Sequence, residues 1–371
     1  MSTEINFEKL LPCGDKLKPL LNKSCINDSD IKELLIKRGV YLGQNDKRHY
    51  IPLLTMSLLS PKEFEYLQEK QKTKEDSIKY RTSKLETQTT DNLQNILPLD
   101  LIQADLINDD TSACEIITDL SFAIETPDKL ILDYELLRDD ITKDWVNSKS
   151  THSGRVTVHK SPNSKNIVFK SEFTSSETQD INKEIVNRVK NHLILNEYVY
   201  KNTEMVSISS NNFTNKERFA FMLQLANHSP NGFLRFEAVS NIEIGPAENA
   251  KLPSDAKWMA DCVKNMIING ESLQNIEYIR NPDYHNSLIL REIAAKYSFK
   301  TGSAKGTCII EYGFPHYFRK YSKDKSFQVS IPKVYFSKSS KSNNIKNVSR
   351  MLLNEFEEMK DLKYTQIKRL W

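Results

Sequence analysis

Apolar side chains recur at helical spacing through the first part of the chain, and this pattern predicts a small helical module over residues 1–70. Ile31, Leu34 and Leu35 fall on one face of the helix predicted in the stretch DIKELLIKR. Gly39 follows this helix at the position where a left-handed residue commonly ends one. We therefore expect a hairpin of short amphipathic helices.

The last helix of this module is followed by a polar segment. Pro61 follows Ser60 and is typical of a first helical position, so a further helix is predicted from residue 61. The polar run behind it predicts a linker or extended surface loop over residues 71–92. Residues 93–147 alternate apolar and acidic positions and predict an acidic α/β segment.

Residues 148–336 predict a mixed α/β body, because helix-like and strand-like periods follow one another. The stretches GRVTVHK and NIVFKSEF flank the turn SPNSK and predict a β-hairpin. Residues 337–371 predict a basic loop and a C-terminal helix. The predicted fold class is α+β, with a helical module, a mixed body and a final helix. Within the body, helices are predicted at 178–199, 215–227, 253–270 and 286–299, and strands at 232–244 and 306–314.

Composition narrows the class of protein. The 371 residues are 27% charged and 39% hydrophobic, and no apolar run reaches the roughly 18 residues that a membrane span needs. The opening MSTEINFEKLL lacks the basic start and apolar core of a signal peptide. Five cysteines lie far apart without a C-x-x-C pair, which favours free thiols over disulfides or a zinc site. We expect a cytoplasmic protein without a metal or cofactor.

The net charge of +3 hides an uneven distribution. Residues 301–350 carry ten Lys or Arg against Glu311 and Asp324, and aromatic residues interleave with them between Tyr312 and Phe336. Basic groups neutralise phosphates and aromatic rings stack on exposed bases, so the segment predicts a nucleic-acid surface. The alternative is a solvated loop over a core strand, with the aromatic residues buried. The predicted phosphate contacts are Arg319, Lys320, Lys323, Lys325, Lys338 and Lys341.

The sequence contains few signals of catalysis. The motifs H-E-x-x-H, G-x-S-x-G and G-x-G-x-x-G are all missing from the sequence. A PD-(D/E)xK nuclease needs two carboxylates beside a lysine to hold Mg²⁺, and Glu237, Glu311 and Asp133 lack a lysine two residues on. We expect no enzymatic activity. The alternative is a divergent metal-dependent nuclease that uses Glu237 or Glu311 with Asp133.

Basic side chains gather around the bend of the N-terminal hairpin. The stretch DIKELLIKRGVYLGQNDKRHYIPLL resembles a SAP or helix–extended-loop–helix module, although its bend is longer and Pro52 interrupts the second helix. The resemblance implies binding of duplex DNA through phosphate contacts with little sequence readout. A structural hairpin is the alternative. The implied contacts are Lys37, Arg38, Lys47, Arg48 and His49.

A broader resemblance covers about the first 80 residues. The stretches LLPCGDKLKPLL, KELLIKRGVYLG and LLSPKEFEYLQEKQKTKEDSIKYRT resemble the opening of the B component of a two-gene bacterial anti-phage defence system, the fourth type of the GAPS group. The resemblance implies a non-catalytic subunit in a hetero-oligomer with a nuclease-type A subunit. We therefore expect a DNA-binding subunit of a defence complex. An assembly or inhibitor protein that does not touch nucleic acid is a further alternative.

The C-terminal helix carries a narrow apolar stripe. Its residues predict either docking onto the body of this chain or an interface helix for a partner. For the interface, the predicted anchors are Leu352, Phe356, Met359 and Trp371.

Overall fold

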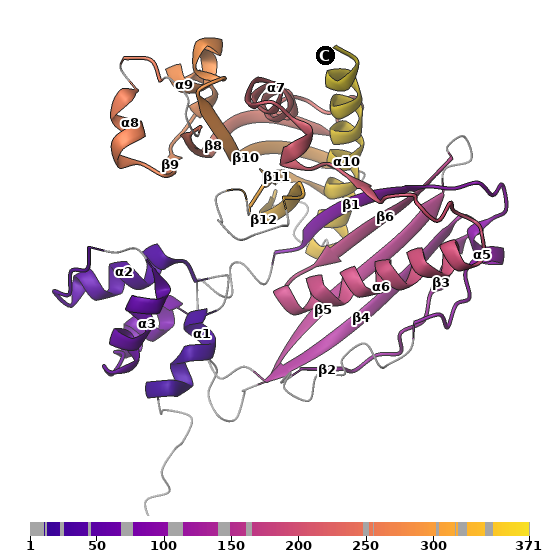
Figure 1. The fold of residues 1–371 in the computed structure, drawn as a ribbon, viewed down its shortest axis with the longest axis horizontal. Coiled ribbons are helices and arrows are strands. Elements are labelled where there is room, and N and C mark those ends of the chain that lie inside the picture. Colours follow the sequence, from indigo (N-terminus) through magenta and orange to yellow (C-terminus); the bar gives the residue numbers. More distant parts are fainter. Residues whose placement is uncertain are drawn as a thin grey trace, which may run out of the picture. The chain divides into compact units, whose positions relative to one another are not determined.

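A computed structural model describes most of the chain, and the account below is confined to those residues. The chain divides into two compact units (Figure 1): unit 1 contains Met1–Asp76 and Glu86–Thr203, and unit 2 contains Ser77–Leu85 and Glu204–Trp371. Each unit is described by itself. The described residues are 11, 13–22, 26–43, 46–67, 77–102, 114–139, 149–160, 165–247, 252–254, 256–301, 304–315, 317, 325–337 and 344–370.

The N-terminal residues of unit 1 form short helices, as predicted. These are η2 (Gly14–Leu17), α1 (Lys18–Asn22), α2 (Asp28–Lys37), α3 (Lys47–Thr55) and a helix over residues 61–67. Asn27 caps α2, and the Asp30 carboxylate accepts a hydrogen bond from the Asn27 N–H at 2.8 Å. Gly39 has a φ of +77°, so the predicted left-handed residue after α2 is confirmed. Buried side chains from all of these helices form one core.

The rest of unit 1 is an antiparallel sheet with a long helix. Strand β4 (Lys129–Asp139) pairs with β5 (Lys149–Lys160), which pairs with β6 (Asn166–Phe173). The other edge of β4 pairs with β2 (Cys114–Ile116) and β3 (Ala123–Thr126). Helix α6 (Ser176–Leu195) lies across the sheet against β5 and β6 (Figure 1), and α5 (Leu93–Ile96) contacts β4. The predicted hairpin is thus β5–β6.

Unit 2 also contains antiparallel strands, which pair side by side. Its strand order is β9–β8–β10–β11–β12–β1, and β7 also pairs with β1. Helices α7 (Asn215–Leu225) and α10 (Ile345–Leu370) pack on one face. The strands are β9 (Met266–Asn269), β8 (Leu234–Pro246), β10 (Leu288–Thr301), β11 (Ala304–Gly313), β12 (Gln328–Phe336), β1 (Lys79–Glu86) and β7 (Val206–Ser207). Shorter helices are η4 (Ser210–Asn212), α8 (Lys257–Cys262), η5 (Leu273–Asn275), α9 (Glu277–Arg280) and η6 (Pro282–Tyr284).

Two buried tyrosines connect the sheet of unit 2 to α7. The Tyr297 hydroxyl donates to the carbonyl of Leu225 at 2.7 Å, and the Tyr312 hydroxyl donates to the carbonyl of Met222 at 3.2 Å. Carbonyls in the last turn of a helix have no partner within that helix. The tyrosines therefore satisfy the end of α7 and fix which face of the sheet it covers.

Three local predictions were wrong in whole or in part. Residues 286–299, predicted as a helix, lie mostly in β10, and the helix predicted over 253–270 contains α8 and then β9. The polar segment predicted as a linker contains β1. A short apolar run such as Leu288–Leu290 fits a buried strand as well as a helix. Pairing of β10 with both β8 and β11 decides for the strand.

Candidate nucleic-acid interface

Arg38, predicted to contact phosphates, is a clamp inside the N-terminal module. Its Nε lies 2.7 Å from Glu63 Oε1, and its other nitrogens donate to Ser57 Oγ at 2.6 Å and to the carbonyl of Leu58 at 2.7 Å. Hydrogen bonding to Arg38 lowers the pKa of Glu63 to about 2, and the same bond raises the pKa of Arg38. Arg38 therefore fastens the end of α2 to the helix over residues 61–67.

The neighbouring basic residues also make contacts within the module. Lys37 pairs with Glu33 at 2.8 Å, and the Lys47 ammonium donates to the carbonyl of Leu21 at 2.9 Å. Arg48 pairs with Asp46 at 2.6 Å, although its side chain is 85% exposed. His49 is exposed. Of the five residues at this bend, Lys37, Arg48 and His49 are exposed, whereas Arg38 and Lys47 connect helices.

The basic C-terminal segment is described in part. Lys325 lies with its Nζ 5.3 Å from the centre of the Tyr317 ring. Tyr312, Phe314 and Phe327 are buried in the core of unit 2, as the alternative interpretation expected. The residues that lie outside the described part of the chain are Arg319, Lys320, Lys323, Lys338 and Lys341.

Tyr335 differs from those aromatic residues, because it is 55% exposed on the sheet face opposite α7 and α10. Directly paired residues of antiparallel strands point to the same face. The register of β8, β10, β11 and β12 sets four such residues in one row across the sheet. In order, that row is Arg235, Ser298, Thr307 and Tyr335.

Lysines occupy the rows on both sides of this one. Lys300 pairs with Lys305 in one row, and Lys296, Ile309 and Lys333 form the other. All four lysines are exposed, as is Arg235. Neither Lys300, Lys333 nor Arg235 forms an ion pair with any residue that the structure describes. We call this surface the basic sheet face, defined by Arg235, Lys296, Lys300, Lys305, Lys333 and Tyr335.

Acidic residues accompany Lys296: Glu237 pairs with it, and Glu271 acts on it at longer range. The pairing of β8 with β10 shifts between Lys296 and Tyr297, which leaves Glu237 as an extra residue on β8. Its carboxylate lies 2.9 Å from the Lys296 ammonium, and this hydrogen bond raises the pKa of Lys296. Lys296 therefore has an acidic partner on β8.

Gly306 allows β11 and β12 to lie close together at the position of Tyr335. A Cβ built on Gly306 would come 2.1 Å from the backbone oxygen of Tyr335 and 3.0 Å from the Phe299 ring. Any larger residue would push the two strands apart at this point. The close strand pairing that places Tyr335 beside Thr307 therefore depends on this glycine.

Sequence reasoning did not find the basic sheet face. Lys296 lies in the segment predicted as a helix and Lys300 directly follows it, whereas Arg235 and Lys305 come from other strands. The stretch KYSFK at residues 296–300 alternates polar and apolar side chains, which is the signal of a half-buried strand. That alternation could have placed its two lysines on one solvent face, but not the cross-strand register.

The acids of the alternative nuclease hypothesis each have a partner within their own unit. Glu237 pairs with Lys296, and Glu311 accepts a hydrogen bond from Ser330 Oγ at 3.4 Å. Asp133 belongs to unit 1 and binds Arg155 through two contacts, one of 2.6 Å. Within the described part of the chain, no group of three or more His, Cys, Asp or Glu is placed to hold a metal ion.

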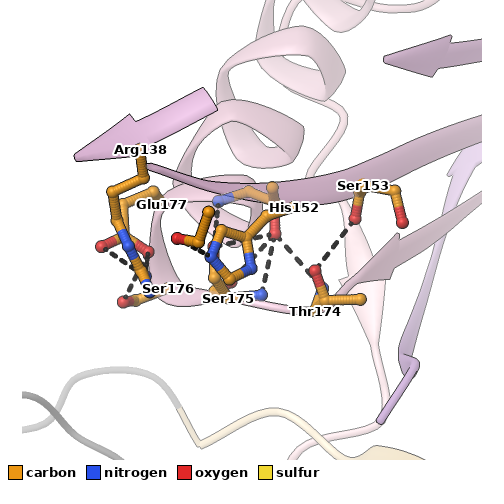
Figure 2. Close-up of polar contacts among 9 residues, drawn as sticks. Arg138, His152, Ser153, Thr174, Ser175, Ser176 and Glu177 are labelled. Atoms are coloured by element: carbon orange, nitrogen blue, oxygen red, sulfur yellow. Dashed lines mark hydrogen bonds and ion pairs between the residues drawn. The ribbon is translucent and has the colours of Figure 1, made fainter. Parts of the chain in front are cut away.

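A second polar cluster lies at the start of α6 in unit 1 (Figure 2). Arg138, at the end of β4, is 4% exposed and lies 3.3 Å from a Glu177 carboxylate oxygen. His152 Nε2 lies 3.0 Å from Ser150 Oγ, and Thr174 Oγ1 donates to the carbonyl of Ser153 at 3.3 Å. The buried Arg138 therefore fastens the first turn of α6 to β4, while the other two contacts lie within β5 and between β5 and the residue Thr174 that precedes α6.

Three predicted anchors of a partner interface are buried within unit 2. Leu352, Phe356 and Met359 are each 0% exposed, because α10 packs with α7 on the sheet. These three residues therefore agree with the other interpretation, in which α10 docks onto the body of its own chain. Trp371 lies outside the described residues.

Comparisons with known proteins bear on the N-terminal module. No curated protein and no solved structure gives a significant match. Among the described helices, none is long and apolar enough to cross a membrane. Residues 15–77 match the family model described as the GAPS4b protein N-terminal domain. This match spans the helices from η2 to the helix over residues 61–67, and it supports a GAPS4b-type defence component.

Proposed function

We propose that this chain is a non-catalytic DNA-binding subunit of a GAPS4b-type anti-phage defence system, acting in the cytoplasm with a nuclease-type subunit. The family match at residues 15–77 supports the defence role. The observation that carries DNA binding is the basic sheet face of unit 2, with five exposed cations around an exposed tyrosine. Cleavage is assigned to the partner subunit.

The charge of this face suits a polyanion. Cations that neutralise phosphates release condensed counterions, which supplies sequence-independent affinity that falls as salt rises. The exposed residues of the basic sheet face present ammonium and guanidinium groups from four strands, so their positions are fixed by the sheet. We therefore expect binding without sequence preference. Arg48 and His49 of the N-terminal module are additional candidate contacts, whereas reversal of Arg38 would disturb folding.

Charge reversal tests the proposal. The full-length variant Lys300→Glu/Lys305→Glu/Lys333→Glu should bind duplex DNA more weakly, and the slope of log K against log salt should fall by up to about 0.9 for each lost contact. Fluorescence anisotropy at several salt concentrations measures both quantities.

A matched control carries the same charge change elsewhere. Lys183, Lys201 and Lys216 are exposed and lie outside the basic sheet face, so their reversal to Glu should change the affinity and the slope much less. Equal losses in the two triple variants would show that only net charge matters. Unchanged binding by the first variant would refute this face as the interface.

A further inference from the structure

We propose that the basic sheet face binds unpaired nucleotides of a single strand, with one base stacked on Tyr335. This inference rests on the nucleic-acid binding proposed above and names the form of nucleic acid that the face accepts. It starts from the exposed fraction of Tyr335, 55%, and from the five exposed cations on the same face, of which Lys296 pairs with the exposed Glu237.

The position of Tyr335 within the face carries the argument. Lys333 lies two residues before it on the same strand, and Lys305 lies in the row on the other side, so lysine rows flank the ring at about 7 Å in each direction along the strands. A base stacked on the ring would place its own strand's phosphates within reach of these flexible side chains. Stacking platforms edged by cations are how proteins hold single strands.

The rest of the row supplies polar groups suited to a nucleotide. Ser298 and Thr307 lie between Arg235 and Tyr335, and the row spans about 14 Å over three strand spacings. Hydroxyl groups can donate to or accept from base edges and sugars. That width matches two or three nucleotides, the number that other single-strand-binding sheets hold.

An intact duplex does not use these features. Its bases are covered by neighbouring base pairs, so Tyr335 would find no free base to stack upon. The described residues of this face lie on four neighbouring strands, which together are broader than the helix or two-stranded ribbon that the major groove admits. Phosphate contacts alone would leave the ring in water. The arrangement therefore favours a single strand, a frayed end or an overhang.

Anisotropy titrations of the full chain test the inference. Three labelled probes are needed: an oligothymidylate of about 12 nucleotides, a blunt duplex of about that length, and the same duplex with a single-stranded overhang. We expect the oligothymidylate and the overhang to bind more tightly than the blunt duplex. Tyr335→Ala should weaken binding of these two probes on the order of 10-fold, with little change for the blunt duplex.

Two further variants separate stacking from other effects. Tyr335→Phe keeps the ring and should restore the affinity for single strands. Tyr200→Ala removes another exposed tyrosine, 64% exposed and in unit 1, and should leave binding unchanged. Circular dichroism confirms that each variant is folded.

Each outcome decides a different point. If Tyr335→Ala binds the oligothymidylate as tightly as the unaltered chain, or if the blunt duplex is preferred, the inference is overturned while the proposed function stands. If no nucleic acid binds, both fail. Binding of polyglutamate in competition with the oligonucleotide, with Tyr335→Ala unaffected, would show an acidic protein segment to be the ligand instead.

Discussion

At the scale of single residues, Gly154 and Tyr134 show how a strand accommodates a ring from its neighbour. The two residues are paired across β5 and β4, and a Cβ on Gly154 would lie 2.2 Å from Cζ of Tyr134. The Tyr134 hydroxyl donates to the carbonyl of Thr178 in α6 at 2.7 Å, and burial raises its pKa. The glycine thus makes room for a side chain that connects sheet to helix.

We expect Gly154→Ala to destabilise unit 1 by about 1–3 kcal/mol, because the added methyl group forces the Tyr134 ring out of its position. Denaturant unfolding monitored by circular dichroism measures the loss. Gly43→Ala is the matched control, since a Cβ there meets no atom within 4 Å, and it should change the free energy of unfolding by about 0.5 kcal/mol or less. Equal stability of Gly154→Ala and the unaltered protein would contradict this account.

At the scale of elements, the N-terminal module shows what a sequence pattern can and cannot predict. Helical spacing located α2, and Gly39 marked its end. The role of Arg38 was missed, because its partner Glu63 is 25 residues away and belongs to another helix. A basic residue at a bend fits a phosphate contact and an internal clamp equally well until the packing of the helices is known.

The clamp predicts a specific response to acid. The pKa of Glu63 is lowered to about 2 in the folded chain, from an ordinary value of 4.5. A lowered pKa gives stability that is fully present above the ordinary value and is lost as the pH falls from about 4.5 towards 2. Glu63→Gln should therefore be less stable than the unaltered chain at about pH 7, and the difference should shrink at about pH 3.

Urea unfolding at the two pH values, followed by helical circular dichroism, checks this expectation. Glu65→Gln serves as the control, because Glu65 is exposed on the same helix. A difference between Glu63→Gln and the unaltered chain that does not change with pH would show that the carboxylate charge of Glu63 contributes nothing to the clamp.

Strand β10 shows that the residue pattern within one segment was not enough to predict the structure of the body. Its first residues, Leu288–Leu290, are all buried, so they lack the alternation that identifies a strand. Only the last part, Lys296–Lys300, alternates clearly. The basic sheet face was therefore beyond sequence analysis, because it depends on the register of four strands whose loops give no hint of which residues become neighbours.

At the scale of the whole molecule, α10 shows how the same apolar stripe can be assigned to an interface or to a core. The sequence predicted the helix and its stripe, and it left both assignments open. In unit 2 the Phe356 ring lies 5.1 Å from that of Tyr312 and 6.1 Å from that of Tyr297, measured between ring centres. The last helix of the chain thus completes the core that the central strands begin.

This placement predicts that Phe356 contributes stability. We expect Phe356→Ala to cost about 3–5 kcal/mol, because it removes a fully buried ring and leaves a cavity between α10 and the sheet. Met351→Ala on the same helix is the control; Met351 is 48% exposed, so its truncation should cost about 0.5 kcal/mol or less. Thermal and denaturant unfolding measure both.

An interface residue would behave in the opposite way, with normal stability of the isolated chain and loss of assembly with a partner. That result for Phe356→Ala would require α10 to leave the sheet in the free protein.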